Sequence, residues 1–199
     1  MKNLHLIVLL TLFGICNDVS AQTLNYLWAN KIGGANNDES RSVAVDAAGN
    51  VYTTGYCQGT VDFDPGVGVY NLPSLGGMDI FISKLDPSGK FLWAKRCGGA
   101  SDDRAFSNFV DANGNVYITG FFQGTANFGP VILSSAGGWD IFIAKMDALG
   151  NFLWVKRIGG TNNEVGFSII SDAGGNVYTT GAFAGAVDFD PGPNAFNMT

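Results

Sequence analysis

The sequence contains a single histidine, His5, close to the N-terminus. Beyond it the chain has no Ser-His-Asp or Cys-His pair for nucleophilic catalysis. It also has no imidazole ligand of the kind that zinc and most transition-metal sites use. Neither chemistry is therefore expected, and no residue is predicted to be catalytic.

Cysteine is also scarce, and after residue 21 only Cys57 and Cys97 remain. When the internal repeats are aligned, these two residues stand where other copies have large apolar residues such as Phe122 and Ile158. We expect two small buried hydrophobic residues rather than a disulfide. In the sheet proposed below they lie on strands two apart, about 9.5 Å from each other, which is too far for an S–S bond.

Positive charge and long apolar runs are missing as well. The net charge is −6, with lysine and arginine scattered along the chain, so no nucleic acid partner is expected. Beyond the N-terminal segment no run reaches the roughly 18 apolar residues of a membrane span, and no membrane insertion is expected.

Residues 1–21 read as a signal peptide. Lys2 supplies the positive charge, the stretch from Leu6 to Cys16 is apolar, and Ala21 ends a small-residue cleavage site. The mature chain is expected to start at Gln22 and to be secreted, extracellular or attached to the cell surface. A membrane anchor is the alternative. Ile15 makes Cys16 a poor lipid-attachment cysteine.

The rest of the chain is built on a repeat, Asp-x-x-Gly-Asn-Val-Tyr-x-Thr-Gly. It begins at Asp46, Asp111 and Asp172. Asp and Gly at this spacing are typical of a tight turn, because Asp accepts backbone hydrogen bonds and Gly adopts positive φ. The β-branched and aromatic residues that follow predict a strand.

Four short strands can be placed in each repeat. The Asp-x-x-Gly turn, which we call the landmark turn, joins the first two strands. A longer loop with Asp-Phe-Asp-Pro-Gly follows, and strands with Asp-Ile-Phe-Ile and Phe-Leu-Trp complete the unit. The fold class is therefore predicted to be all-β, a β-propeller of four-stranded antiparallel blades. A parallel β-helix is the alternative.

These motifs resemble the β-propeller repeat of secreted bacterial surface proteins, the SBBP-type repeat. The resemblance covers essentially all of residues 24–199. It implies a secreted or surface-attached bacterial propeller, usually inside a larger protein. The family has no agreed catalytic site, so the resemblance transfers none.

The propeller is expected to be incomplete, with about two and a half blades. The repeat region, 22–199, divides into a lone fourth strand at 24–34, blade one at 41–97, blade two at 105–158 and a partial blade three at 166–199. We expect an N-terminal fragment of a larger protein. Were the chain complete, its open blades would favour self-association.

The carboxylates of the long loops are candidate metal ligands. Calcium binds several carboxylate and carbonyl oxygens, and the candidates are Asp62, Asp64, Asp188 and Asp190. The competing interpretation is a polar turn with Phe63 or Phe189 fixed in the core. No other cofactor is expected.

Binding is expected on the loop face, opposite the tight turns, because variable polar loops on a rigid scaffold usually carry function. The candidate ligand-contacting residues are Asn37, Asp38, Asp102, Asp103, Asn163 and Glu164. Trp139 is the candidate exposed aromatic. The recurring Trp28, Trp93 and Trp154 are interpreted as packing between blades rather than as sugar platforms.

The sequence thus predicts a non-catalytic scaffold or binding module for an unknown protein or glycan. The alternative is a fragment of a propeller enzyme acting on polysaccharide, with its catalytic residues in blades outside this sequence. A carboxylate pair on central strands would favour the enzyme.

Overall fold

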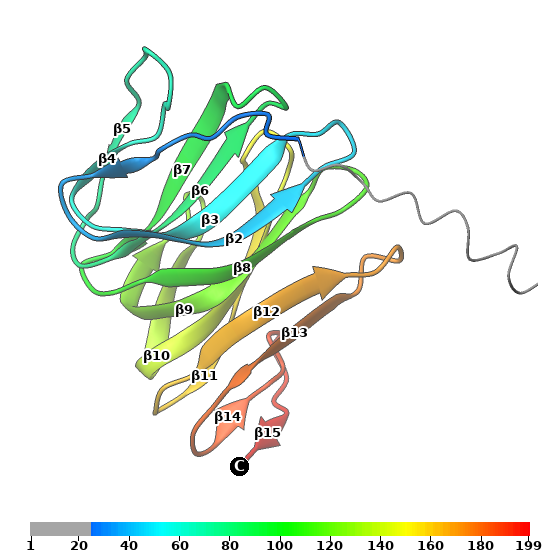
Figure 1. Cartoon of the computed structure of the whole chain (residues 1–199). Helices are drawn as coiled ribbons and strands as arrows, with labels where there is room; N and C mark the ends of the chain where they lie inside the picture. Colours follow the sequence, from blue (N-terminus) through cyan, green and yellow to red (C-terminus); the bar gives the residue numbers. More distant parts are fainter. Residues whose placement is uncertain (1–24) are drawn as a thin grey trace, which may run out of the picture.

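Residues 25–199 are described by a computed structural model, and all of their regular elements are β-strands (Figure 1). The predicted signal peptide, Gln22 and Leu24 lie outside the described residues. Within the described part there is no helix, and hence none of a length and apolarity to cross a membrane. Every strand pair is antiparallel, which confirms the all-β prediction and excludes the parallel β-helix.

The main strands form three similar units. The first pairs in the order β2 (Asp38–Val45), β3 (Val51–Cys57), β6 (Asp79–Leu85) and β7 (Phe91–Gly99). The second pairs in the order β8 (Arg104–Val110), β9 (Val116–Asn127), β10 (Ile132–Met146) and β11 (Phe152–Gly160). In the third, β12 (Val165–Ser171) pairs with β13 (Val177–Ala182).

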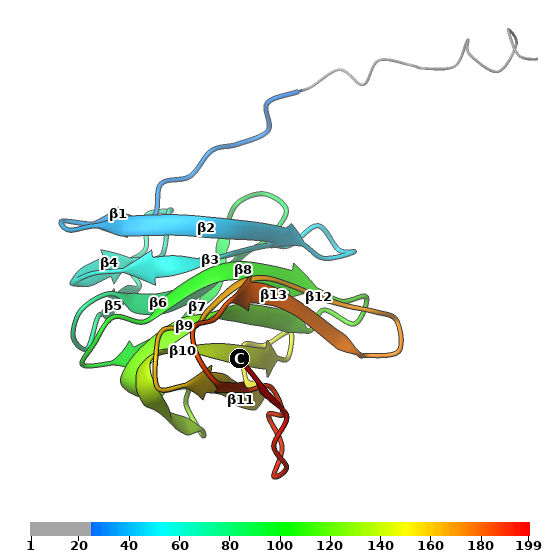
Figure 2. The same ribbon diagram turned by 90° about the horizontal axis from the view of Figure 1, so that it is seen from below.

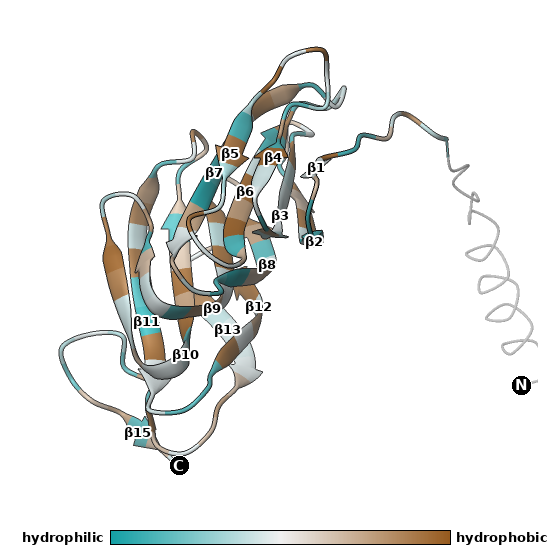
Figure 3. Ribbon diagram, turned by 90° about the vertical axis from the view of Figure 1, so that its left-hand side faces the viewer, coloured by the Kyte–Doolittle hydropathy of each residue, from teal (hydrophilic) through white to brown (hydrophobic). Residues whose placement is uncertain are grey.

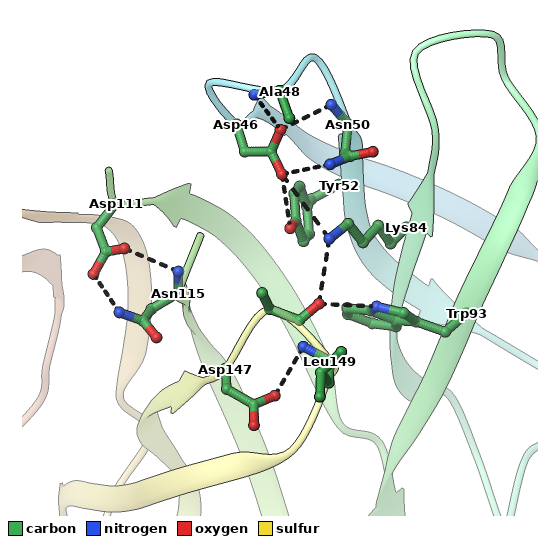
Figure 4. Close-up of polar contacts among 11 residues, drawn as sticks. Asp46, Ala48, Asn50, Tyr52, Lys84, Trp93, Asp111, Asn115, Asp147 and Leu149 are labelled. Atoms are coloured by element: carbon green, nitrogen blue, oxygen red, sulfur yellow. Dashed lines mark hydrogen bonds and ion pairs between the residues drawn. The ribbon is translucent and has the colours of Figure 1, made fainter. Parts of the chain in front are cut away.

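Tight turns of the predicted kind connect the strands at one end of each unit (Figure 4). Asp46 Oδ1 accepts the backbone N–H groups of Ala48 at 3.0 Å and Asn50 at 2.9 Å. Its Oδ2 accepts the Asn50 side-chain amide at 2.8 Å and the Tyr52 hydroxyl at 3.1 Å. The same side-chain contacts recur around Asp111 and Asp172. Gly49 closes the first turn with φ of 83°.

The segment with Asp-Phe-Asp-Pro-Gly was predicted as a loop, and that prediction was wrong in part. It carries a short hairpin, formed by β4 (Thr60–Asp62) with β5 (Asn71–Pro73) and by β14 (Val187–Asp188) with β15 (Asn197–Met198). In the second unit the same hairpin continues β9 and β10, as Ile132 pairs with Asn127.

Each of these hairpins pairs with the Gly-Gly that precedes its unit. β1 (Gly33–Gly34) pairs with β4, Gly98 and Gly99 with β9, and Gly159 and Gly160 with β14. Glycine is required because the strands approach closely. A Cβ on Gly99 would lie 1.9 Å from the Thr125 carbonyl oxygen. These pairings join β1 to the first unit and each later unit to the one before it.

The predicted lone strand at 24–34 is largely absent, since only Gly33 and Gly34 form β1. A strand needs a hydrogen-bonded neighbour. β7 and β11 have β6 and β10 beside them, whereas no described strand pairs with residues 25–32. Figure 2 shows this segment, in dark blue, leading from the grey trace to β1 at the edge of the stacked strands.

Apolar residues of neighbouring units pack face to face into a shared core. The largest cluster joins Tyr52, Ile80 and Ile82 of the first unit to Phe122 and Phe142 of the second. Figure 3 shows brown apolar bands alternating with teal polar bands along the strands. This alternation is the period of two that a β-strand imposes on its side chains.

The cysteine prediction is confirmed in this core, and the tryptophan prediction is confirmed for Trp93 and Trp154 but not for Trp28. Cys57 on β3 and Cys97 on β7 are buried, unbonded and separated by β6. Trp93 and Trp154 pack against the apolar clusters.

Candidate functional site

The first strand of each unit contains a β-bulge at its loop end. In β2, Ser40 pairs with Gly55 and Ser42 with Thr54, so that Arg41 is the extra residue. The bulges of β8 and β12 place Phe106 and Phe167 in the same position. Bulges redirect side chains and often occur next to functional sites.

The glycine that ends the repeat Asp-x-x-Gly-Asn-Val-Tyr-x-Thr-Gly leaves the space that this bulge needs. A Cβ on Gly55 would lie 1.9 Å from the carbonyl oxygen of Glu39, and a Cβ on Gly120 would lie 1.9 Å from that of Arg104. No side chain fits at such a distance. The Thr-Gly of the repeat is therefore a signal for the bulge on the opposite strand.

The three bulge residues follow one another across the units, and we call them the bulge row: Arg41, Phe106 and Phe167. The Arg41 guanidinium carbon lies 5.4 Å from the centre of the Phe106 ring. The Phe106 and Phe167 rings are 6.2 Å apart. Phe167 is 54% exposed. The row thus places a cation against an aromatic face and leaves an apolar ring open to solvent.

A second arginine lies between aromatic rings beside the row. The Arg104 guanidinium is 4.9 Å from the Tyr56 ring and 5.8 Å from the Phe121 ring. Arg41 donates a hydrogen bond to the Tyr56 hydroxyl at 3.0 Å. Tyr56 in turn donates to Glu39. Both arginines are thereby held in fixed positions by cation–π contacts and hydrogen bonds.

Trp139, the predicted exposed aromatic, is half-buried and belongs to this group. Its ring stacks on Phe121, with centroids 4.6 Å apart and an angle of 19° between the planes. Trp139 is also linked to the next unit, because its backbone N–H donates to Asn163 Oδ1 at 3.0 Å. We call the following residues the Arg–aromatic cluster: Arg41, Tyr56, Arg104, Phe106, Phe121 and Trp139.

Each arginine also pairs with one exposed acid. Arg41 contacts Glu39 at 3.0 Å, and Arg104 contacts Asp102 at 2.8 Å, with side chains between 28% and 48% exposed. Ion pairs this exposed contribute little to stability.

The recurring acidic residue of the inter-unit loop has a structural contact in every copy. Asp38, Asp103 and Glu164 accept the backbone N–H of Gly34, Gly99 and Gly160, respectively, at 2.6, 2.7 and 2.8 Å. Asp103 and Glu164 are fully buried. Burial raises the pKa of Asp103 to about 7. These carboxylates fix the loop that follows each Gly-Gly by accepting its backbone N–H. That they contact a ligand stays a prediction.

The remaining predicted loop residues lie at the surface near the cluster. Asp102 Oδ1 accepts the Met78 N–H at 3.0 Å, and this hydrogen bond lowers the pKa of Asp102. Asn163 makes the equivalent contact one unit later, with Trp139. Asn37 is exposed in the loop before β2. The structure thus brings Asp102, Asn163 and Trp139 to the unit junctions beside the Arg–aromatic cluster.

The calcium candidates form turns. Asp62 Oδ1 accepts the N–H groups of Asp64 at 3.0 Å and Tyr70 at 2.8 Å. Asp188 makes the same contacts with Asp190 and Phe196, and the Phe196 hydrogen bond lowers the pKa of Asp188. Among residues 25–199 no three His, Cys, Asp or Glu side chains are grouped to hold a metal ion. Phe63 is fully buried, as the turn interpretation predicts.

The Arg–aromatic cluster was not identified from the sequence. Its signal is weak, because the bulge residue is arginine in the first unit and phenylalanine in the next two. The position is recognisable only once the repeats are aligned on Ser42, Ser107 and Ser168, the residue after each bulge.

Two comparisons with known proteins agree with the repeat architecture. Residues 27–61 match a family model described as a β-propeller repeat, SBBP. An uncharacterized WD repeat-containing protein of Acanthamoeba polyphaga mimivirus is 29% identical over 186 residues, which cover 80% of this chain. They cover 13% of that relative, so the chain spans a small part of its length. The chain is thus an all-β, antiparallel protein with similarity to β-propeller repeats.

Proposed function

We propose that this chain is a non-catalytic scaffold of four-stranded propeller blades, secreted or displayed on a bacterial cell surface, that binds an acidic glycan. The single observation that carries the proposal is the Arg–aromatic cluster on the loop face. Aromatic rings offer flat apolar surfaces, and guanidinium groups form bidentate hydrogen bonds with carboxylates. Together they suit a sugar ring that bears a carboxylate.

The positions of the side chains support this assignment. Trp139 stacks on Phe121, and the Arg104 guanidinium carbon lies 5.8 Å from the centre of the same Phe121 ring. Arg41 continues the cluster toward Phe106. The contacts thus join the Trp139 ring and two guanidinium groups in one cluster. Both are already oriented, which lowers the entropy cost of binding.

The buried carboxylates support a scaffold more than a polysaccharide-active enzyme. A glycosidase needs an acid and a base that reach the sugar. Asp103 has a raised pKa, but it is fully buried and accepts hydrogen bonds from the backbone of Gly99 and Gln123. Asp79 and Asp140 are also fully buried, and each pairs with an arginine of its own unit.

The proposal is tested by calorimetric titration of the protein with oligogalacturonides and with neutral xylo-oligosaccharides of the same length. We expect binding of the uronates, weakened about tenfold by Arg41→Gln through loss of a charged hydrogen bond. Trp139→Ala is expected to weaken it similarly. Met78→Ala is the matched control, because Met78 occupies the position of Trp139 in the first unit. Equal binding of both sugars, or uronate affinity unchanged in both variants, would contradict the proposal.

A further inference from the structure

The hairpin of the second unit lacks the two aspartates of the other hairpins. Asn127 stands at the register of Asp188, since each pairs with the first glycine of a Gly-Gly. The Asn127 side-chain oxygen accepts the N–H of Gly129 at 2.7 Å, as Asp188 accepts that of Asp190 at 3.0 Å. The turn contact is therefore kept in the second unit, while both negative charges are absent.

This neutral hairpin borders a pocket that contains two cations. Lys95 and Arg96 on β7 line a pocket of about 300 Å³, together with Gly129 and Pro130 at the hairpin tip and Phe152 at the start of β11. None of the described residues that line it is acidic. Among residues 25–199 no carboxylate forms an ion pair with Lys95. Its ammonium group is thus available to an anion that enters the pocket.

Both cations are held in position by the protein. Arg96 pairs at 3.2 Å with Asp79, which is fully buried. A guanidinium group has five N–H donors, so this ion pair leaves others for a ligand. The stem of Lys95 lies along the turn before β11, because a Cβ on Gly150 would lie 3.1 Å from Lys95 Cε. Groups that are already oriented lose less entropy when a ligand binds.

The corresponding pocket of the third unit contains carboxylates of its own. Lys156 and Arg157 border a pocket of about 290 Å³ with Asp188 and Asp190 of the hairpin. The hydrogen bond from Phe196 and, to a smaller extent, the charge of Arg157 lower the pKa of Asp188. The third unit thus shows that a carboxylate suits the place beside the lysine–arginine pair. In the second unit that place has no carboxylate from the hairpin.

The first unit shows an aromatic ring that the second hairpin also lacks. Tyr70 of the first hairpin packs on Phe91, the first residue of β7, with ring centroids 4.8 Å apart. The second hairpin is shorter, and Val131 takes the hydrogen-bonding position of Tyr70. Phe152, which corresponds to Phe91, contacts the buried Phe128 edge-to-face at 5.8 Å and lines the pocket. A ring from outside can therefore take the place that Tyr70 fills in the first unit.

We propose that the pocket between β7 and the second hairpin binds a small aromatic carboxylate. The ligand carboxylate accepts hydrogen bonds from Lys95 and Arg96, where the third unit has its own aspartates. The ligand ring packs on Phe152, as Tyr70 packs on Phe91. The volume is at the lower end of the range for small-molecule sites, which suits a single ring. Both walls of the pocket belong to this chain.

This pocket shares no residue with the Arg–aromatic cluster, so the two binding proposals are independent. The experiment is a titration of the ¹⁵N-labelled full chain with 4-hydroxyphenylacetate, followed by NMR. We expect saturable shifts of the backbone amide signals of Gly129 and Asn151, which line the pocket. The neutral 4-hydroxyphenylacetamide is expected to bind about tenfold more weakly, because it cannot form charged hydrogen bonds. Acetate, which has the charge without the ring, is expected to bind more weakly as well.

Variants assign the binding to this pocket. Lys95→Gln removes the unpaired ammonium, so affinity is expected to fall about tenfold. Asn127→Asp restores the carboxylate of the other hairpins and keeps the turn contact, and its charge is expected to weaken binding about threefold. Lys156→Gln is the matched control, because that lysine belongs to the pocket with its own aspartates, and affinity should not change. Arg41→Gln, in the Arg–aromatic cluster, should also leave it unchanged.

Three outcomes would overturn the proposal. The first is equal binding of 4-hydroxyphenylacetate and its amide, and the second is an equal loss of affinity in Lys95→Gln and Lys156→Gln. The third is binding that is lost in Arg41→Gln and kept in Lys95→Gln, which would place the ligand in the Arg–aromatic cluster. Unchanged signals of Gly129 and Asn151 throughout the titration would likewise exclude the pocket. None of these outcomes bears on uronate binding, which is tested separately with oligogalacturonides.

Discussion

The carboxyl groups of Asp79 and Asp103 meet over the same glycine. A Cβ on Gly98 would lie 2.5 Å from Asp79 Oδ1 and 2.8 Å from Asp103 Oδ2. Both acids are fully buried. Burial raises the pKa of each, and the charge of Asp79 raises that of Asp103 further.

This pair predicts a loss of stability as pH rises from about 4 to 7. The pKa of Asp103 is about 7 in the folded chain, against an ordinary value of 3.8. Between these values the folded state binds more protons than the unfolded state, so the free energy of unfolding falls with rising pH. Above pH 7 the contribution of Asp103 is constant.

Urea unfolding between pH 4.5 and 8 measures this dependence. Asp103→Asn cannot ionise and is expected to flatten the decline, although Asp79 and Asp140, with pKa values raised by burial, keep part of it. Asp102→Asn is the control, because the pKa of Asp102 is lowered and lies below this window. A decline of equal slope in Asp103→Asn and the parent protein would disprove the assignment.

The bulge glycine predicts a large effect from a single methyl group. Gly120→Ala would place a Cβ 1.9 Å from the Arg104 carbonyl oxygen, within a buried strand. Relieving this clash requires the β8 backbone to move, so we expect a loss of roughly 3 kcal/mol in the free energy of unfolding. Denaturant titration measures it.

Gly175→Ala is the matched control for that variant. Gly175 has φ of 82° and no neighbour within 4 Å of an added Cβ. Only the strain of the left-handed backbone remains, about 1 to 2 kcal/mol. Should the two alanine variants be equally stable, the steric role given to the bulge glycine is wrong.

Local features of the fold were predictable because they depend on residues close in sequence. The Asp-x-x-Gly turn contains all of its own hydrogen-bond partners, as Asp46 and Asn50 show. Short turns also explain why β2 pairs with β3 and β6 with β7. The burial of Cys57 was predictable because aligned copies have a large apolar residue there.

Features that join distant segments were missed. The pairing of Gly98 with Asn127 depends on a backbone approach between two units. The Arg–aromatic cluster depends on a one-residue shift of register, which moves Arg41 out of the regular alternation. Neither leaves a periodic pattern in a single stretch of sequence. The long loop was therefore predicted without its hairpin, and the first strand of each unit without its bulge.

Both core cysteines are predicted to be unreactive in the folded protein. Burial raises the pKa of Cys57 to about 12 and also raises the pKa of Cys97. A thiol reacts as its thiolate, which is scarce at neutral pH under these conditions. In a Cys16→Ser background we expect no reaction with Ellman's reagent in buffer and reaction of both thiols in guanidinium chloride. Rapid labelling of the native protein would contradict the buried positions.

Replacing Lys84 tests how much its contact with the turn of the next unit contributes to stability. Its ammonium lies over the Tyr52 ring, donates to the Ala148 carbonyl at 3.3 Å and is 3.9 Å from Asp46. Lys84→Met keeps the aliphatic stem and removes these contacts, so we expect a loss of about 2 kcal/mol in the free energy of unfolding. Lys145→Met is the comparison, because Lys145 makes the equivalent contact with the Tyr117 ring, which alone is worth less than about 1 kcal/mol. Urea titrations of both variants measure the difference. Equal losses would mean that neither the carbonyl of the neighbouring turn nor Asp46 adds to the cation–π contact.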